Sequence, residues 1–235
     1  MIREELIKRS PFRIFEQSIH GGAGKGNIGI IAARKGVGKT ACLVHLATDQ
    51  LFQGKHVVHV SFATDTSHIV AWYEDIFEEI AQRYKLEGAM DIHDEIVRHR
   101  IILNFKQDGV SATQVQKSLL SIIKDAHFTA DLVVVDGYDF VKSSTAEVRL
   151  FKELAEQLGI EIWFSATLSN GQSIRGDTGI PKLLDPFREF ITILITLDPC
   201  ESHVNLNLVI DHDSTPNCEL HLKLDPQILL IADEV

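Results

Sequence analysis

Residues 33–40 carry the clearest chemical signal in this chain of 235 residues. They read Ala-Arg-Lys-Gly-Val-Gly-Lys-Thr, a glycine-rich run that ends in a lysine and a hydroxyl residue. In such a run the backbone N–H groups curl around a polyphosphate, the lysine reaches the β- and γ-phosphates, and the hydroxyl binds Mg²⁺. We therefore predict that Lys39 contacts phosphate and that Thr40 is a ligand of Mg²⁺.

The residues on either side of this run supply the context that a phosphate-binding loop requires. Residues 28–32 (Ile-Gly-Ile-Ile-Ala) are typical of a buried strand, and residues 40–53 are typical of a helix that ends before Gly54. The helix N-terminus adds a partial positive charge at the loop. Ala33 departs from the motif, which usually has glycine there, and a glycine-rich turn without a ligand is the alternative. The predicted nucleotide-binding residues are Lys35, Gly36, Val37, Gly38, Lys39, Thr40 and Ala41.

A second candidate is Asp136, which ends the apolar run 132–136. An acid at the carboxyl end of a buried strand points into the crevice where open α/β sheets bind nucleotides. We predict that Asp136 and Thr40 together hold Mg²⁺, with Asp136 acting directly or through a water molecule. The alternative role for Asp136 is a helix cap or a turn, and turn chemistry explains the nearby Asp139 equally well.

The elements that must position these residues alternate between strands and helices along most of the chain. Apolar and β-branched runs predict strands at 28–32, 57–62, 101–105, 132–136 and 160–165. Helical periodicity and capping signals predict helices at 40–53, 69–84, 88–99, 111–127 and 145–158. Beyond residue 190 the pattern changes to consecutive strands at 190–197, 204–210, 218–224 and 228–231. We therefore predict an α/β fold with a mostly parallel central sheet flanked by helices and a C-terminal antiparallel β extension.

Domain organisation follows from the absence of any linker-like stretch. Residues 1–20 are predicted as an N-terminal arm or short helix, and residues 21–235 as a single nucleotide-binding domain. Residues 20–27 contain a Gly-Lys pair that imitates a second phosphate loop. No predicted strand precedes that pair and no helix follows it directly, so we interpret it as a flexible turn leading into the first strand.

Composition excludes several classes of function. Apolar content of 45% and charged content of 24% are ordinary for a globular protein, and no uncharged apolar run is long enough to span a bilayer. The three widely spaced cysteines predict free thiols and a cytoplasmic location. The net charge of −10 argues against nucleic acid as the main partner without excluding it. His93 lies among acids, and we interpret its segment as a solvated helix face rather than a metal site.

The run 29–41 resembles the phosphate loop of RecA-like ATPases, with the DnaB-type replicative helicase ATPase domain as the most similar subgroup and KaiC-like proteins as relatives. Other segments resemble the second strand, the Walker B strand, the sensor strand and the closing hairpin of that family, respectively 54–62, 132–136, 163–165 and 208–226. The resemblance implies a RecA-like P-loop NTPase fold that binds ATP and Mg²⁺.

Two departures from the family pattern concern hydrolysis. The glutamate that activates the attacking water corresponds here to Ala63, and Asp65, the nearest acid, is a candidate substitute at a different offset. The lysine and arginine that reach the γ-phosphate of a neighbouring subunit correspond to Asp211 and Asp213. An arginine finger contributes about 10³–10⁵ in rate, and a carboxylate cannot replace it. We therefore expect ATP hydrolysis to be weak or to depend on a partner.

The loop 169–181 corresponds to the segment with which helicases and recombinases contact single-stranded DNA. Arg175 is its only basic residue and Asp177 lies close by, whereas a DNA groove needs clustered cations and aromatic platforms. We therefore expect a nucleotide-dependent regulatory or assembly factor that works with a protein partner or by self-association. A motor or recombinase subunit acting on nucleic acid and a P-loop kinase are the two alternatives.

Overall fold

The computed structural model describes residues 7, 12–63, 65–83, 90–106, 110–169, 179–225 and 231–233. The helices are α2 (Phe12–Ser18), α3 (Lys39–Phe52), α4 (Ser67–Arg83), α5 (Met90–Arg98), α6 (Ala112–Leu120) and α7 (Thr145–Leu158). A π-helical turn, η1 (Ser121–Asp125), extends α6, and a 3₁₀ helix, η2 (Asp185–Phe190), precedes β6. The strands are β1 (Ile28–Arg34), β2 (Val57–Ser61), β3 (Arg100–Asn104), β4 (Leu132–Asp136), β5 (Glu161–Leu168), β6 (Ile191–Pro199), β7 (Val204–Asp211), β8 (Cys218–Leu224) and β9 (Ile231–Asp233).

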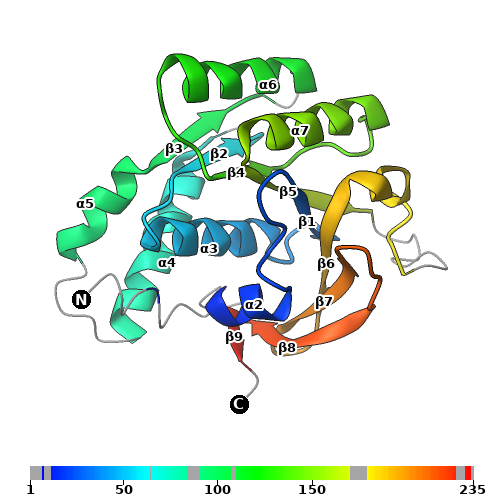
Figure 1. Cartoon of the computed structure of the whole chain (residues 1–235). Coiled ribbons are helices and arrows are strands. Elements are labelled where there is room, and N and C mark those ends of the chain that lie inside the picture. The colour runs from blue at the N-terminus through cyan, green and yellow to red at the C-terminus, as the bar shows by residue number, and fades with distance from the viewer. Residues whose placement is uncertain are drawn as a thin grey trace.

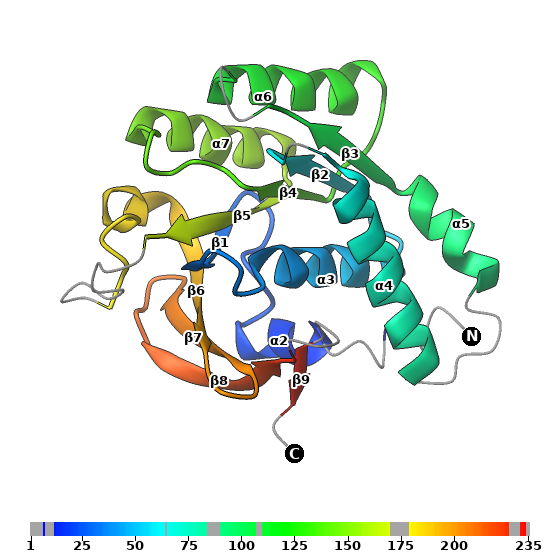
Figure 2. The same ribbon diagram turned by 180° about the vertical axis from the view of Figure 1, so that it is seen from behind.

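One sheet runs through the described part of the chain, with the strand order β3-β2-β4-β5-β1-β6-β7-β8-β9. The strands from β3 to β6 in that order are parallel, and β7, β8 and β9 continue the sheet in antiparallel pairs. Helices α6 and α7 cover one face, while α2, α3 and α4 lie on the other, as both views show (Figures 1 and 2). The predicted parallel sheet with an antiparallel extension is therefore confirmed.

Burial on both faces explains the continuous apolar strands at the centre of the sheet. Each residue of β4 is buried, and so are the first six residues of β1. Gly29 on β1 makes room for the fully buried indole of Trp163, because a Cβ at Gly29 would lie 2.5 Å from that ring. Parallel strands covered by helices on both sides require this uninterrupted apolar pattern.

Helix ends follow the capping signals in the sequence. Ser111 forms a capping box with Gln114 at the start of α6, as its position predicts, and Ser144 forms the same motif with Glu147 at the start of α7. Gly159 ends α7 in the left-handed conformation that glycine adopts easily. Among the helices that the structure describes, none combines the length and apolarity needed to cross a membrane.

The end of the predicted N-terminal arm packs on the domain. Phe15 and Ile19, on and just after α2, are fully buried in the core beneath α3. The guanidinium of Arg13 pairs with the carboxylate of Asp49, whose side chain is buried in α3. This pair and the two apolar side chains together fix α2 against the helix that begins at the predicted phosphate loop.

The chain between α2 and β1 is a series of tight turns. Its backbone is held by Glu161, whose carboxylate accepts hydrogen bonds from the N–H groups of Ala23 at 2.9 Å and Gly24 at 3.3 Å. The same oxygen accepts from the indole N–H of Trp163 at 2.7 Å. This segment leads into β1, in agreement with its interpretation as a turn.

We predict that His45 makes the stability of this fold depend on pH. His45 lies fully buried on α3, and burial lowers its pKa from 6.5 to about 3. The unfolded chain therefore binds a proton near pH 6.5 that the folded chain rejects, so the free energy of unfolding falls as the pH drops from 7 toward 3. Between pH 7 and pH 5 this residue should cost about 2 kcal/mol. Urea unfolding of the wild type and of His45→Leu at both pH values measures the contribution, and equal pH slopes in the two proteins would contradict it.

Candidate nucleotide-binding site

The predicted phosphate loop lies at the carboxyl edge of the parallel strands, between β1 and α3 (Figure 1). Gly36 and Gly38 have φ angles of 81° and 112°, in the left-handed region that favours glycine. Gly38 is the N-cap of α3, so Lys39 and Thr40 form the first turn of the helix. The first N–H groups of a helix have no partner within it and can bind an anion. The loop therefore has the backbone form of an anion site.

Leu224, at the end of β8, packs against this loop from the C-terminal part of the chain. A Cβ added at Gly38 would lie 2.5 Å from Cδ2 of Leu224, whereas a Cβ at Gly36 would meet no atom within 4 Å. Leu224 is 1% exposed. The sequence predicts that Leu224 belongs to a strand but gives no signal of this contact, which joins residues far apart in the chain.

Lys39 is held close to the loop that precedes it. Its ammonium group donates to the carbonyl oxygens of Ala33 at 3.2 Å and Arg34 at 2.9 Å, and the residue is only 8% exposed. Burial lowers the pKa of Lys39, and the nearby negative charge of Asp136 partly opposes this effect. The amine thus lies at the predicted loop, within the field of the predicted metal ligand.

Thr40 and Asp136, the two predicted metal ligands, are brought into direct contact. The hydroxyl of Thr40 donates to Oδ2 of Asp136 at 2.9 Å, although 96 residues separate them. A hydroxyl oxygen beside a carboxylate is a donor set that Mg²⁺ accepts, because this ion prefers oxygen ligands. The residues present therefore fit a nucleotide with Mg²⁺, and their ligand roles stay predictions.

The end of β2, where the family pattern has its glutamate, carries no carboxylate at the matching position. Ala63 is half-buried, and its N–H donates to the hydroxyl of Ser61 at 3.1 Å. Asp65 is exposed and accepts from the N–H and hydroxyl of Ser67 at 2.9 and 2.6 Å. Hydrogen bonds from Ser67 lower the pKa of Asp65, which makes it a weaker base. Its candidate catalytic role stays a prediction that this placement does not favour.

Asp211 is engaged in a contact that the sequence did not predict. Its carboxylate lies 2.5 Å from Nδ1 of His20 and 2.8 Å from Nδ1 of His212, and the residue is 7% exposed. His20 lies just after α2, so the contact joins the N-terminal segment to the end of β7. This buried aspartate therefore has a structural partner on each of its two oxygens.

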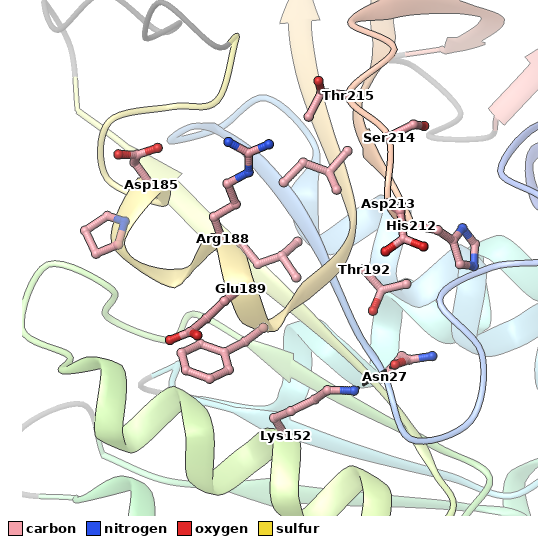
Figure 3. Close-up of a pocket in the computed structure, with 14 residues that line it drawn as sticks. Asn27, Lys152, Asp185, Arg188, Glu189, Thr192, His212, Asp213, Ser214 and Thr215 are labelled. Carbon is pink, nitrogen blue, oxygen red and sulfur yellow. Dashed lines mark hydrogen bonds between the residues drawn. The ribbon is translucent and has the colours of Figure 1, made fainter.

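Asp213 lines a cavity at the opposite edge of the sheet from the phosphate loop. The cavity has a volume of about 710 Å³ and includes Asn27, just before β1, and Ile191, the first residue of β6. Asp213 reaches it from the turn after β7, and Arg188 reaches it from η2 on a different wall (Figure 3). Within one subunit, then, Asp213 is remote from the loop that it was predicted to affect.

Two other predicted features have plain outcomes. The carboxylate of Asp139 accepts from the N–H of Val141 at 3.1 Å, which is turn chemistry. Within the described ranges no group of His, Cys, Asp or Glu is arranged to hold a metal, and His93 lies instead beside Glu74 on α4. Most of the predicted DNA-contact loop, with Arg175 and Asp177, lies outside the described residues.

We predict that the two loop glycines differ sharply in their tolerance of a side chain. Gly36→Ala should cost only the strain of its left-handed backbone, about 1 kcal/mol. Gly38→Ala adds the collision with Leu224 and should cost about 3 kcal/mol. In a Leu224→Ala background the cost of Gly38→Ala should fall to that of strain alone. Urea unfolding of the four variants gives these differences, and equal costs at both glycines would show that Leu224 does not constrain the loop.

No protein-family model matches the sequence, and no curated protein matches it. Among solved structures, the chain is similar to the ATPase domain of a DnaB-like helicase, with a TM-score of 0.70 and 18% sequence identity. The match covers 96% of this chain and 90% of that one. An identity this low bears on the fold alone, and with the sheet order and loop described above it confirms the expected architecture. The chain has the fold of a RecA-like P-loop ATPase domain.

Proposed function

We propose that this protein binds ATP with Mg²⁺ and acts as a nucleotide-dependent regulatory or assembly factor that hydrolyses ATP slowly by itself. The observation that carries the proposal is the contact between Thr40 and Asp136 beside Lys39, at the end of a left-handed glycine loop. This arrangement supplies every group needed to hold a triphosphate and its metal ion. The similarity to an ATPase domain supports the same conclusion.

Each part of the site has a distinct role in this proposal. The loop N–H groups from Gly36 to Ala41 bind phosphate oxygens, and Lys39 leaves the carbonyls of Ala33 and Arg34 to pair with the β- and γ-phosphates. Thr40 and Asp136 hold Mg²⁺. The bound ion would neutralise the charge that develops on the phosphates.

The groups that break the γ-phosphate bond are the weak part of the site. The methyl group of Ala63 cannot accept a proton from water, and Asp65 is bound to Ser67. Asp211 is paired with His20 and His212, and neither Asp211 nor Asp213 can provide the positive charge of an arginine finger. A site that binds but rarely cleaves ATP suits a switch, in which the bound nucleotide changes a surface that another protein or copy recognises.

We predict that Lys39→Ala weakens ATP binding by at least about tenfold, since it removes a buried charge-assisted contact. Lys142→Ala is the matched control, because Lys142 follows β4 at the same edge of the sheet but is 72% exposed and pairs with Asp139. Isothermal titration with ATP and Mg²⁺ measures both. Unchanged affinity in Lys39→Ala would remove the nucleotide assignment.

We predict that Ala63→Glu increases ATP turnover by at least about tenfold, because a positioned general base typically contributes about 10²–10⁴-fold. Ala63→Gln has nearly the same shape without a proton acceptor and should leave turnover at the wild-type level. Release of inorganic phosphate under saturating ATP measures the rates. Fast turnover by the wild-type protein alone would sink the regulatory proposal, and equal rates in the two variants would show that the missing carboxylate does not limit hydrolysis.

A further inference from the structure

The backbone around Asp136 is fixed from both neighbouring strands. Its carbonyl oxygen accepts from the N–H of Phe62, which follows β2, at 3.0 Å. On the other side, the N–H of Gly137 donates to the hydroxyl of Ser165 on β5 at 2.8 Å. Ser165 is 2% exposed, so this hydrogen bond is shielded from water. The chain is therefore held just before and just after the point where it leaves the sheet.

The hydroxyl of Ser165 takes the place of a backbone acceptor at this point. The pairing of β4 with β5 ends at Val135 and Phe164, whereas the pairing of β4 with β2 continues to Asp136 and Ser61. On the β5 side the ladder thus stops one residue before the predicted metal ligand. A backbone N–H beyond the ladder needs another partner, and the side chain of Ser165 supplies it.

The conformation of Gly137 makes this hydrogen bond consequential. Gly137 has a φ of 84°, in the left-handed region, and a Cβ there would come to 3.4 Å from Cβ of Phe62. A glycine in such a turn has many accessible conformations, so its direction depends on the groups that hold it. A small rotation at this step would move the carboxylate of Asp136 away from the hydroxyl of Thr40.

We propose that Ser165 is a positioning residue for the metal site: by holding Gly137 it keeps the Asp136 carboxylate beside Thr40. This inference rests on the nucleotide and Mg²⁺ binding proposed above. Ser165 acts through the backbone and touches neither phosphate nor metal. The serine on the other flanking strand, Ser61, holds Ala63 instead, so the two serines fix different segments of the same edge.

The test separates metal positioning from general stability by measuring ATP affinity with and without Mg²⁺. In Ser165→Ala we expect the affinity in EDTA to stay within about twofold of the wild type, because the loop and Lys39 are intact. The gain in affinity on adding Mg²⁺ should fall by about tenfold, the lower range for loss of a group that orients a metal ligand. Isothermal titration at 25 °C gives both values.

Two further variants control for packing and for loss of a buried hydroxyl. Thr196→Val removes a buried hydroxyl on β6 that has no hydrogen-bond partner among the described residues, and should leave the Mg²⁺ effect unchanged. Gly137→Ala strains the same backbone step at a half-buried position without altering β5, and should reduce the Mg²⁺ effect as Ser165→Ala does. It also answers the question if Ser165→Ala does not fold.

Amide hydrogen exchange of Gly137 by NMR reports the hydrogen bond itself, without any ligand. We expect slow exchange in the wild type and at least about tenfold faster exchange in Ser165→Ala, since exchange requires the bond to open. If exchange accelerates but the Mg²⁺ effect persists, Ser165 is structural and the inference is wrong. If the wild type binds no ATP, the proposed function fails, and the exchange result still shows whether Ser165 holds Gly137.

Discussion

The hydrogen bond from Thr40 to Asp136 is the interaction on which the site depends. It crosses the sheet from the first turn of α3 to the end of β4, and β5 lies between β4 and β1 in the strand order. Such a contact forms only if the parallel strands end at one edge and if the glycine loop turns α3 back over that edge. The buried apolar strands and the left-handed glycines both serve this requirement.

Many constraints converge on the same edge. Leu224 packs on Gly38 from the antiparallel part of the sheet, and Phe62 and Ser165 hold the backbone next to Asp136. The predicted phosphate and metal groups are therefore built into rigid elements, which is what a binding site needs. The position at Ala63 has no comparable chemistry. This contrast between a well-supported binding half and an incomplete hydrolytic half is the reason to propose a nucleotide switch rather than a fast ATPase.

Local patterns in the sequence predicted most of the fold and the composition of the predicted loop. Strand and helix positions agree within a few residues, and Ser111 caps its helix as expected, because capping and periodicity depend on near neighbours. Contacts between distant residues left no such signal. Nothing near Asp211 indicates that His20, 191 residues away, lies beside it. The packing of Leu224 on Gly38 and the hydrogen bond from Gly137 to Ser165 were missed for the same reason.

A site that binds ATP but rarely cleaves it should retain the intact nucleotide. The most direct measurement incubates the wild-type protein with labelled ATP and Mg²⁺, separates bound from free nucleotide, and identifies the bound species over time. We expect one ATP per site that remains mostly ATP for many minutes, and no such retention in Lys39→Ala. Rapid conversion of the bound nucleotide to ADP, or no bound nucleotide at all, would contradict the proposed switch.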